Sequence, residues 1–204
     1  MQIVFGRLIL NFNLHIPFYQ TELQQLYMEV QELMVSNPFI KWSLCFFFYC
    51  FVGWIWETCY VFVRTGHWEN RGFLQGPFLP IYGFGALIIL WFTTPARGNI
   101  WLIFLLGMLG ASLLEYFGGV MLEELFHMRY WDYSGVPFNL NGHVCLPCSF
   151  VWGIFSILLV KWLHGWVNEW VTSIPRTLGF LIAVALILLV SSDFVHSTGE
   201  ALRL

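Results

Sequence analysis

The chain has 204 residues, of which 58% are hydrophobic and only 10% are charged, and its mean hydropathy is +0.70. This profile excludes an ordinary soluble domain and is typical of a protein that crosses a membrane several times. The net charge of −3 gives no reason to expect nucleic acid as a partner, and the length leaves no room for a separate soluble catalytic domain beside the spans.

Residues 1–38 are predicted to form a separate interfacial segment. The apolar start carries Arg7 and lacks a small-residue cleavage site, so we expect no signal peptide. Thr21 and Gln24 match a capping box, and the apolar residues that follow recur at helical spacing. This pattern predicts an amphipathic helix before the first span. Its charged residues are all acidic, so we expect it to pack against the bundle or a partner and not against anionic lipid.

Residues 39–204 are predicted to form an all-α membrane bundle of about five transmembrane helices, because the apolar runs approach the length needed to cross roughly 30 Å of hydrocarbon. The expected spans are Trp42–Val63, Pro77–Phe92, Asn99–Met121, Cys145–Leu163 and Thr177–Val195. The second span is short and has Pro77 and Pro80 in its first turn. We therefore expect an irregular entry to this span that is buried in protein.

Three acidic residues interrupt apolar runs that are otherwise free of charge: Glu57, Glu115 and Asp193. An ionisable group costs free energy in hydrocarbon, so its presence there indicates a functional site. Because consecutive spans alternate in direction, all three acids approach the same membrane face. Asp193 is the weaker signal, since the serines and the histidine around it indicate a span that is already leaving the membrane.

Glu57 and Glu115 lie at matched depth, since each precedes the expected end of its span by about six residues, or about 9 Å. They could face each other across a polar cavity, share a proton, bind a cation or pair with Arg71 or another basic group. The structural alternative is a buried ion pair or a protonated acid that holds helices together.

Two long connections, residues 64–76 and 122–144, open on the face that carries the acids, and long irregular connections often carry function. The second is the more polar and includes a group of candidate ligand contacts: Trp131, Asp132, Asn139 and Asn141. In one interpretation it is a lid, with Trp131 and Tyr133 as stacking faces and Asp132, Asn139 and Asn141 as oxygen and amide contacts to a polar ligand. In the other it is an ordered turn, because Asp and Asn readily bond nearby backbone.

The Cys145–Cys148 pair gives a competing chemistry, because a C-x-x-C at a helix N-terminus favours thiolate and supports disulfide exchange. A thiol oxidase needs a second exchangeable pair on the same face, and only Cys59 is expected nearby. A zinc site that includes His143 and His127 is not supported, because the chain has no second C-x-x-C motif. The chain has no P-loop, G-x-S-x-G or H-E-x-x-H motif, and we expect no cofactor or metal.

Two longer patterns carry a family resemblance. The first is the run GFLQGPFLPIYGFG at residues 72–85, and the second combines LEYFGG at 114–119, WDYS at 131–134 and PFNLNG at 137–142 with Cys145-Leu146 and Trp152-Gly153. Together they resemble the CmpB-like ABC-transporter type IV membrane proteins of bacteria. The resemblance implies a multi-pass protein of the bacterial inner membrane. Family members often have Arg at the position of His143 and a residue other than Cys at Cys148, which makes the C-x-x-C incidental.

The leading functional hypothesis is a permease-type component that binds or translocates a small polar solute. Glu57 and Glu115 would carry proton or cation coupling, Arg71 would offset their charge or hold an anionic group, and the Trp131–Asn141 loop would gate access. Besides the lipid bilayer, the expected partners are a separate ATPase subunit or further copies of the chain. The alternatives are an intramembrane enzyme that acts on a lipid or isoprenoid headgroup, with a carboxylate as general base beside Arg71, and a scaffold subunit without catalysis.

Overall fold

The computed structural model describes residues 26, 28–29, 37–70, 72–127 and 129–202. Within them, four helices are long and apolar enough to cross a membrane: α3 (Pro38–Thr65), α5 (Ile100–Phe126), the continuous helix Leu146–Thr172, and α8 (Arg176–Ala201). A fifth apolar helix, α4 (Pro80–Thr93), is shorter. The all-α membrane bundle is therefore confirmed. The predicted N-terminal amphipathic helix lies almost entirely outside the described residues.

Capping residues mark three of the helix ends. Asn37 precedes Pro38, and its side chain accepts the backbone N–H of Phe39 at 2.9 Å. Asn99 accepts the N–H groups of the first residues of α5 at 3.0 and 3.2 Å. Gly66 ends α3 in the left-handed conformation, with φ of 75°. These residues satisfy backbone groups that a helix end leaves unpaired, and so they fix where the spans begin and end.

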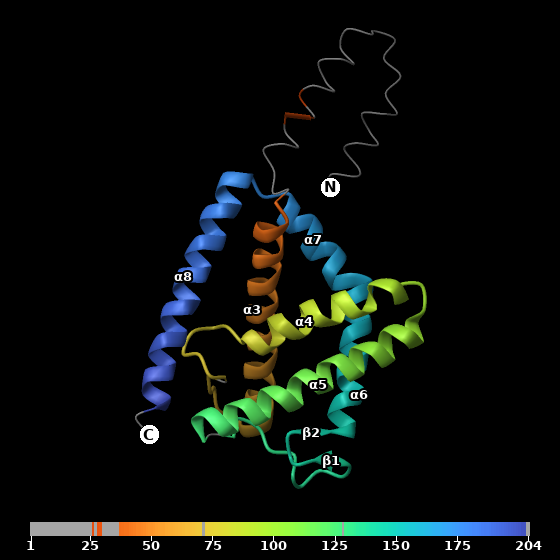
Figure 1. Cartoon of the computed structure of the whole chain (residues 1–204), viewed down its shortest axis with the longest axis vertical. Helices are drawn as coiled ribbons and strands as arrows, with labels where there is room; N and C mark the ends of the chain where they lie inside the picture. The colour runs from red at the N-terminus through yellow and green to blue at the C-terminus, as the bar shows by residue number, and fades with distance from the viewer. Residues whose placement is uncertain (1–25, 27, 30–36, 71, 128, 203–204) are drawn as a thin grey trace.

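The second span has the irregular entry that its prolines predict. Residues 77–79 precede the helix, and the Leu79 N–H donates to the Cys50 carbonyl of α3 at 3.1 Å before α4 starts at Pro80. In Figure 1, α4 and α5 are strongly inclined to α3 and α8, which run along the long axis of the molecule. The non-helical backbone is satisfied by protein, as an embedded segment requires.

The fourth span is longer than the predicted Cys145–Leu163. It comprises α6 (Leu146–Leu158), a π-helical segment η2 (Leu159–Leu163) and α7 (His164–Thr172). The helix continues because Val167 and Val171, one turn apart, are completely buried in the core. The Tyr49 hydroxyl of α3 also pairs with His164 Nδ1 at 2.8 Å. Packing against α3 thus continues the helix beyond the predicted end at Leu163.

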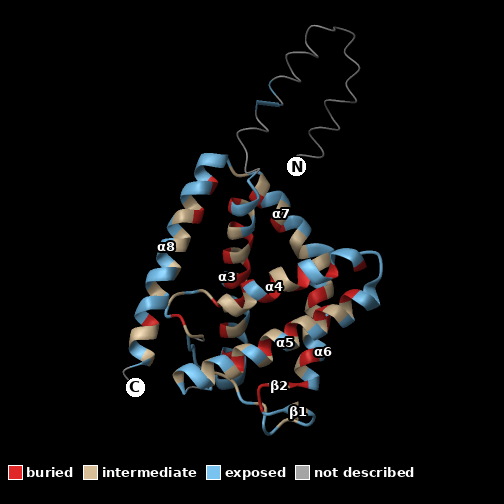
Figure 2. Ribbon diagram, in the orientation of Figure 1, coloured by how far each residue is buried: buried red, intermediate tan, exposed pale blue. Residues whose placement is uncertain are grey.

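The buried core lies around the first half of α3, α4 and α7, and its members include Ile40, Leu44, Leu90 and Val167. Figure 2 shows buried positions concentrated on α3 and α4, whereas α8 is largely exposed. Close approach of helices depends on several glycines, Gly53 and Gly107 among them. A Cβ at Gly53 would lie 2.2 Å from Tyr82 Cγ, and one at Gly107 would lie 2.1 Å from Ser156 Oγ. The tilt of α4 and the pairing of α5 with α6 therefore require the absence of a side chain there.

Candidate functional site

The end of the molecule away from the start of α3 gathers several helix termini. Figure 1 shows the ends of α3, α5 and α8 and the start of α6 at this end, together with a short hairpin. The hairpin pairs β1 (Asn139–Leu140) with β2 (Val144–Cys145) in antiparallel register. The acids from three spans therefore approach one face.

Glu115 on α5 is the central group of this end, and it is only 6% exposed. Both of its carboxylate oxygens accept hydrogen bonds. The Tyr133 hydroxyl, from the connection after α5, donates to Oε1 at 3.0 Å, and Trp152 Nε1 of α6 donates to Oε2 at 3.2 Å. No Lys, Arg or His among the described residues forms an ion pair with it. The acid is thus held by neutral donors inside the bundle.

Glu57 on α3 is linked to Glu115 through aromatic side chains. The Tyr82 hydroxyl of α4 donates to Glu57 Oε2 at 2.9 Å. The Tyr82 ring packs edge-on against Trp152, with ring centroids 5.5 Å apart, and Trp152 donates to Glu115. Glu57, Tyr82, Trp152, Glu115 and Tyr133 form the acid cluster. One continuous chain of contacts thus joins α3, α4, α6, α5 and the following connection.

Tyr133 lies outside the spans and keeps its proton at physiological pH. Burial, and then the neighbouring Glu115 carboxylate, raise the pKa of its phenol above the usual value, because both disfavour a phenolate. The hydroxyl therefore remains a donor to Glu115. The sequence predicted Tyr133 as a stacking face of the loop, whereas in the structure its hydroxyl binds Glu115, and Tyr82 was not predicted as a site residue. Their positions beside the acids depend on how the chain folds back.

The other predicted loop residues bind mainly within the loop and to the end of α5. Asp132 accepts the Ser134 N–H at 2.9 Å, Trp131 Nε1 donates to the His143 carbonyl at 2.8 Å, and Asn139 donates to the Val136 carbonyl at 2.8 Å. Asn141 Nδ2 donates to the Tyr116 hydroxyl of α5 at 3.2 Å. These bonds describe an ordered turn that places Tyr133 on Glu115. Arg71 lies outside the described residues.

An ion-pair group anchors this loop to the end of α5. Arg129 donates to both carboxylate oxygens of Glu123, at 2.9 and 3.1 Å, and to Asp132 at 3.2 Å. His143 Nε2 lies 3.3 Å from the same Glu123 carboxylate. A bidentate guanidinium–carboxylate pair fixes orientation as well as distance. The anchor therefore fixes the direction in which the connection leaves α5.

We expect the order of this loop to depend on acidic pH through Asp132. Hydrogen bonds from Ser134, and then Arg129, lower the pKa of this carboxyl below the usual value. A lowered pKa means that the stabilisation is present above the unfolded-state pKa and is lost as pH falls through the folded-state pKa. Hydrogen-exchange protection of residues 132–136, corrected for intrinsic rates, should fall over that acidic range. An Asp132→Ala variant should show low protection throughout, and equal pH dependence in both proteins would contradict the assignment.

Asp193 of α8 lies at the same end but holds the first connection. Its oxygens accept the backbone N–H groups of Gln75 at 3.1 Å and Gly76 at 2.8 Å, and the Ser197 hydroxyl lies at 3.3 Å. Gln75 also bonds to Glu200 through its side chain. The third acid of the sequence pattern therefore ties α8 to the segment that leads into α4.

Neither carboxylate of the acid cluster lines the pocket of about 350 Å³ that opens beside the end of α3. The cysteines are free thiols, with Cys145 buried and Cys148 half-buried. Among the residues that the structure describes, no group of three or more His, Cys, Asp or Glu side chains is placed to hold a metal. The groups that donate hydrogen bonds to the two cluster acids are the phenols of Tyr82 and Tyr133 and the indole of Trp152.

A helical bundle with four helices long and apolar enough to cross a membrane, a shorter apolar helix and a buried Glu115 near one face defines a multi-pass membrane protein. The family described as "Putative ABC-transporter type IV" matches residues 44–198, and the chain belongs to this family. The predicted family resemblance is thereby confirmed, and with it a membrane transport component as the class of protein. Comparison with curated proteins and with solved structures gave no match.

Proposed function

We propose that this protein is the permease-type component of a bacterial inner-membrane transporter and that it binds or translocates a small polar solute. The single observation that carries the proposal is Glu115, a carboxylic acid buried in a membrane-spanning helix and held by two neutral donors. Ionisable groups inside spans are rare because they are costly, and they commonly belong to solute, ion or proton pathways. Membership of an ABC-transporter family supports the same class of function.

The acid cluster supplies the elements that such a pathway needs. Glu57 and Glu115 are the proton or cation sites, and Tyr82, Tyr133 and Trp152 are the donors that orient them. The donors come from α4, α6 and the second connection, so a movement of any one of these elements changes the hydrogen bonding of an acid. The loop that covers this end is shaped by Trp131, Asp132, Asn139 and Asn141. In this proposal Arg71, which follows Asn70 in the first connection, offsets the charge of the acids or holds an anionic group of the solute.

The energy for transport would come from another chain. The sequence has no G-x-x-x-x-G-K-[ST] motif, so an ATPase that drives this component would be a separate subunit, or the component would work as an oligomer in the bilayer. In this arrangement the acid cluster senses the solute, and the partner subunit senses the nucleotide.

Glu115→Gln and Glu57→Gln are expected to weaken solute recognition without unfolding the protein. A panel of amino acids, sugars, polyols and small ammonium compounds is screened by thermal stabilisation of the detergent-solubilised protein, and radiolabelled hits are then tested for uptake by proteoliposomes. Loss of a charged hydrogen-bond partner should weaken binding by about tenfold or more. Glu124→Gln is the matched control, because Glu124 lies exposed near the end of the same helix α5.

Three outcomes separate the candidate functions. A solute that is bound and accumulated by the wild type but not by Glu115→Gln supports transport. An altered lipid profile in a deletion strain, reproduced by Glu115→Gln, identifies an intramembrane enzyme instead. Unchanged binding, uptake and lipid profile in both acid variants would leave a scaffold subunit and would overturn the proposal.

A further inference from the structure

The two hydrogen-bond donors that hold Glu115 differ in what they can do when the acid takes up a proton. The Trp152 indole N–H, 3.2 Å from Oε2, is a donor only, whereas the Tyr133 hydroxyl, 3.0 Å from Oε1, can donate or accept. An ionised Glu115 accepts from both. A protonated Glu115 must keep Oε2 as the acceptor for Trp152 and carry its proton on Oε1, where the O–H donates to the Tyr133 oxygen. Of the two partners, Tyr133 is therefore the one that fits both states of the acid.

The Tyr133 hydroxyl has a second acceptor for its own proton in the Cys148 thiol of α6. Both Glu115 and Cys148 lie within hydrogen-bonding contact of this hydroxyl. The Cys148 thiol in turn contacts Cys145, so its S–H can be directed to the neighbouring sulfur while its own lone pairs remain for Tyr133. A thiol sulfur is a weak acceptor, but it leaves a phenol proton paired in a half-buried position. Rotation of the hydroxyl about its C–O bond thus exchanges one acceptor for the other.

The backbone around Tyr133 holds the ring in place while the hydroxyl turns. The Tyr133 N–H donates to the Gly142 carbonyl, and the Val136 N–H donates to the Tyr133 carbonyl, each at 2.8 Å. The ion pair between Arg129 and Glu123 fixes the same loop to the end of α5. A phenol on a fixed backbone can change its hydrogen bond without the movement of a helix, so the exchange needs no large rearrangement.

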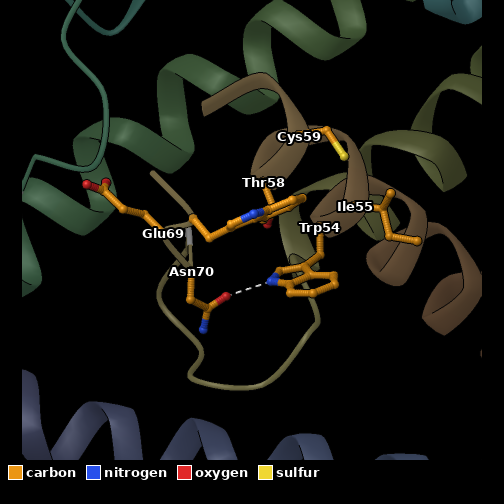
Figure 3. A pocket seen from close by; sticks show the side chains of 7 residues that line it. Trp54, Ile55, Thr58, Cys59, Glu69 and Asn70 are labelled. Carbon is orange, nitrogen blue, oxygen red and sulfur yellow. Dashed lines mark hydrogen bonds between the residues drawn. The ribbon is translucent and has the colours of Figure 1, made fainter. Parts of the chain in front are cut away.

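A proton is the species that fits Glu115. Among the described residues, the ionisable groups that face it are Tyr133, Cys148, Glu57 of α3 and Tyr82 of α4, and none of these is basic. A carboxylate buried in a span without a basic partner is costly, and a proton removes that cost. The pocket in Figure 3 is lined by side chains of α3 and the first connection, and Glu115 is not among them. A solute or a hydrated cation needs a cavity at the carboxylate, whereas a proton needs only the hydrogen bonds that are already there.

We propose that Glu115 takes up and releases a proton and that Tyr133 and Cys148 form the switch that keeps both of its states hydrogen-bonded. In the ionised state the Tyr133 O–H donates to Glu115 Oε1. In the protonated state the new O–H of Glu115 donates to the Tyr133 oxygen, and the Tyr133 O–H turns to the Cys148 sulfur. Each cycle takes one proton from water and returns it, and the phenol and both thiols of the C-x-x-C keep their protons throughout. The switch rests on the proposed function, and the coupling ion of that permease is then a proton and not a metal cation.

Infrared difference spectroscopy tests the switch without a solute. The full-length protein in proteoliposomes is perfused with buffers of stepwise lower pH, and spectra are recorded in H2O and D2O. We expect a C=O band of a protonated carboxyl to appear on acidification, to shift in D2O and to be absent in Glu115→Gln. An S–H band should change with the same midpoint and should be absent in Cys148→Ala.

Variants separate the contributions of the two partners. Tyr133→Phe leaves the O–H of Glu115 without its acceptor, so the C=O band should move to higher frequency and the S–H band should no longer respond to pH. Cys148→Ala removes the acceptor of the turned phenol and should weaken proton binding about threefold, which lowers the midpoint by about half a pH unit. Cys148→Ser supplies an oxygen acceptor and should restore the midpoint. Cys59→Ala removes an exposed thiol of α3 and should leave both responses unchanged.

An undiminished carboxyl band in Glu115→Gln, or no such band in the wild type, would overturn the proposal, since Glu115 would then exchange no proton. A carboxyl band without a matching S–H change in the wild type would overturn the switch, and this result requires no variant to fold. An unchanged midpoint in Cys148→Ala would do the same. The solute screen fails separately. A protein that shows both bands but binds and accumulates no solute keeps the switch and loses the proposed function, whereas uptake of a solute with no proton exchange at Glu115 keeps the function and loses the switch.

Discussion

Replacing Asp193 with alanine is expected to release the first connection from α8 and to lower the free energy of unfolding by about 2 kcal/mol. The carboxylate accepts the backbone N–H groups of Gln75 and Gly76, from a segment 117 or more residues away in the sequence. Hydrogen bonds to a charged acceptor contribute about 1.5 to 3 kcal/mol each, and the exposure of the Gln75 bond lowers the expected total. Thermal unfolding in detergent measures the loss.

A local readout distinguishes this anchor from a general effect on folding. In proteoliposomes, limited proteolysis should cut the Asp193→Ala protein within residues 66–79 faster than the wild type. His196→Ala is the matched control, since His196 is exposed on the same helix and its closest acidic partner, Glu200, lies 3.9 Å away. Unchanged cleavage of the first connection in Asp193→Ala, together with unchanged stability, would show that other contacts hold this segment.

Replacing Gly53 with alanine is expected to destabilise the bundle and to disturb the acid cluster at the same time. A Cβ at this position would lie 2.2 Å from Tyr82 Cγ and 2.4 Å from Tyr82 Cβ, so the Tyr82 side chain must move together with α4. That movement pulls the Tyr82 hydroxyl from Glu57, to which it donates at 2.9 Å. Overpacking typically costs about 1 to 3 kcal/mol, and two contacts at 2.2 and 2.4 Å place this substitution in the upper part of that range, above the gain of about 1 kcal/mol from replacing Gly by Ala in a helix.

Gly165→Ala is the matched control for this substitution. Gly165 lies in α7, and an added Cβ there would meet no atom within 4 Å. This variant should therefore be as stable as the wild type or more stable by up to about 1 kcal/mol. A Gly53→Ala/Tyr82→Ala double variant removes Cγ and the ring, which include the closest atom, and should therefore lose less stability than the sum of the two single variants. Additive losses in the double variant would place the strain elsewhere.

The acid cluster illustrates what patterns along the chain reveal about a membrane site. Glu57 and Glu115 stand out because hydrocarbon penalises a charge, and alternation of the spans brings them to one face. The donors Tyr82, Tyr133 and Trp152 carry no such signal, since aromatic residues are abundant in every segment of this chain. Asp193 carries the same sequence signal, an acid inside an apolar run, but it does not belong to the acid cluster. Its oxygens accept backbone N–H groups of the first connection.

The sequence by itself determined the membrane class, the approximate spans, the irregular entry to the second span and the family, because apolar run length, proline and capping residues act locally on the backbone. Only the tertiary structure decided which side chains meet. The extension of the fourth span to Thr172, the contact of Tyr82 with Glu57 and the placing of Tyr133 on Glu115 depend on the rotation and tilt of whole helices. Those quantities follow from packing between residues far apart in the chain, such as Gly53 against Tyr82, and such contacts leave no periodic trace in the sequence.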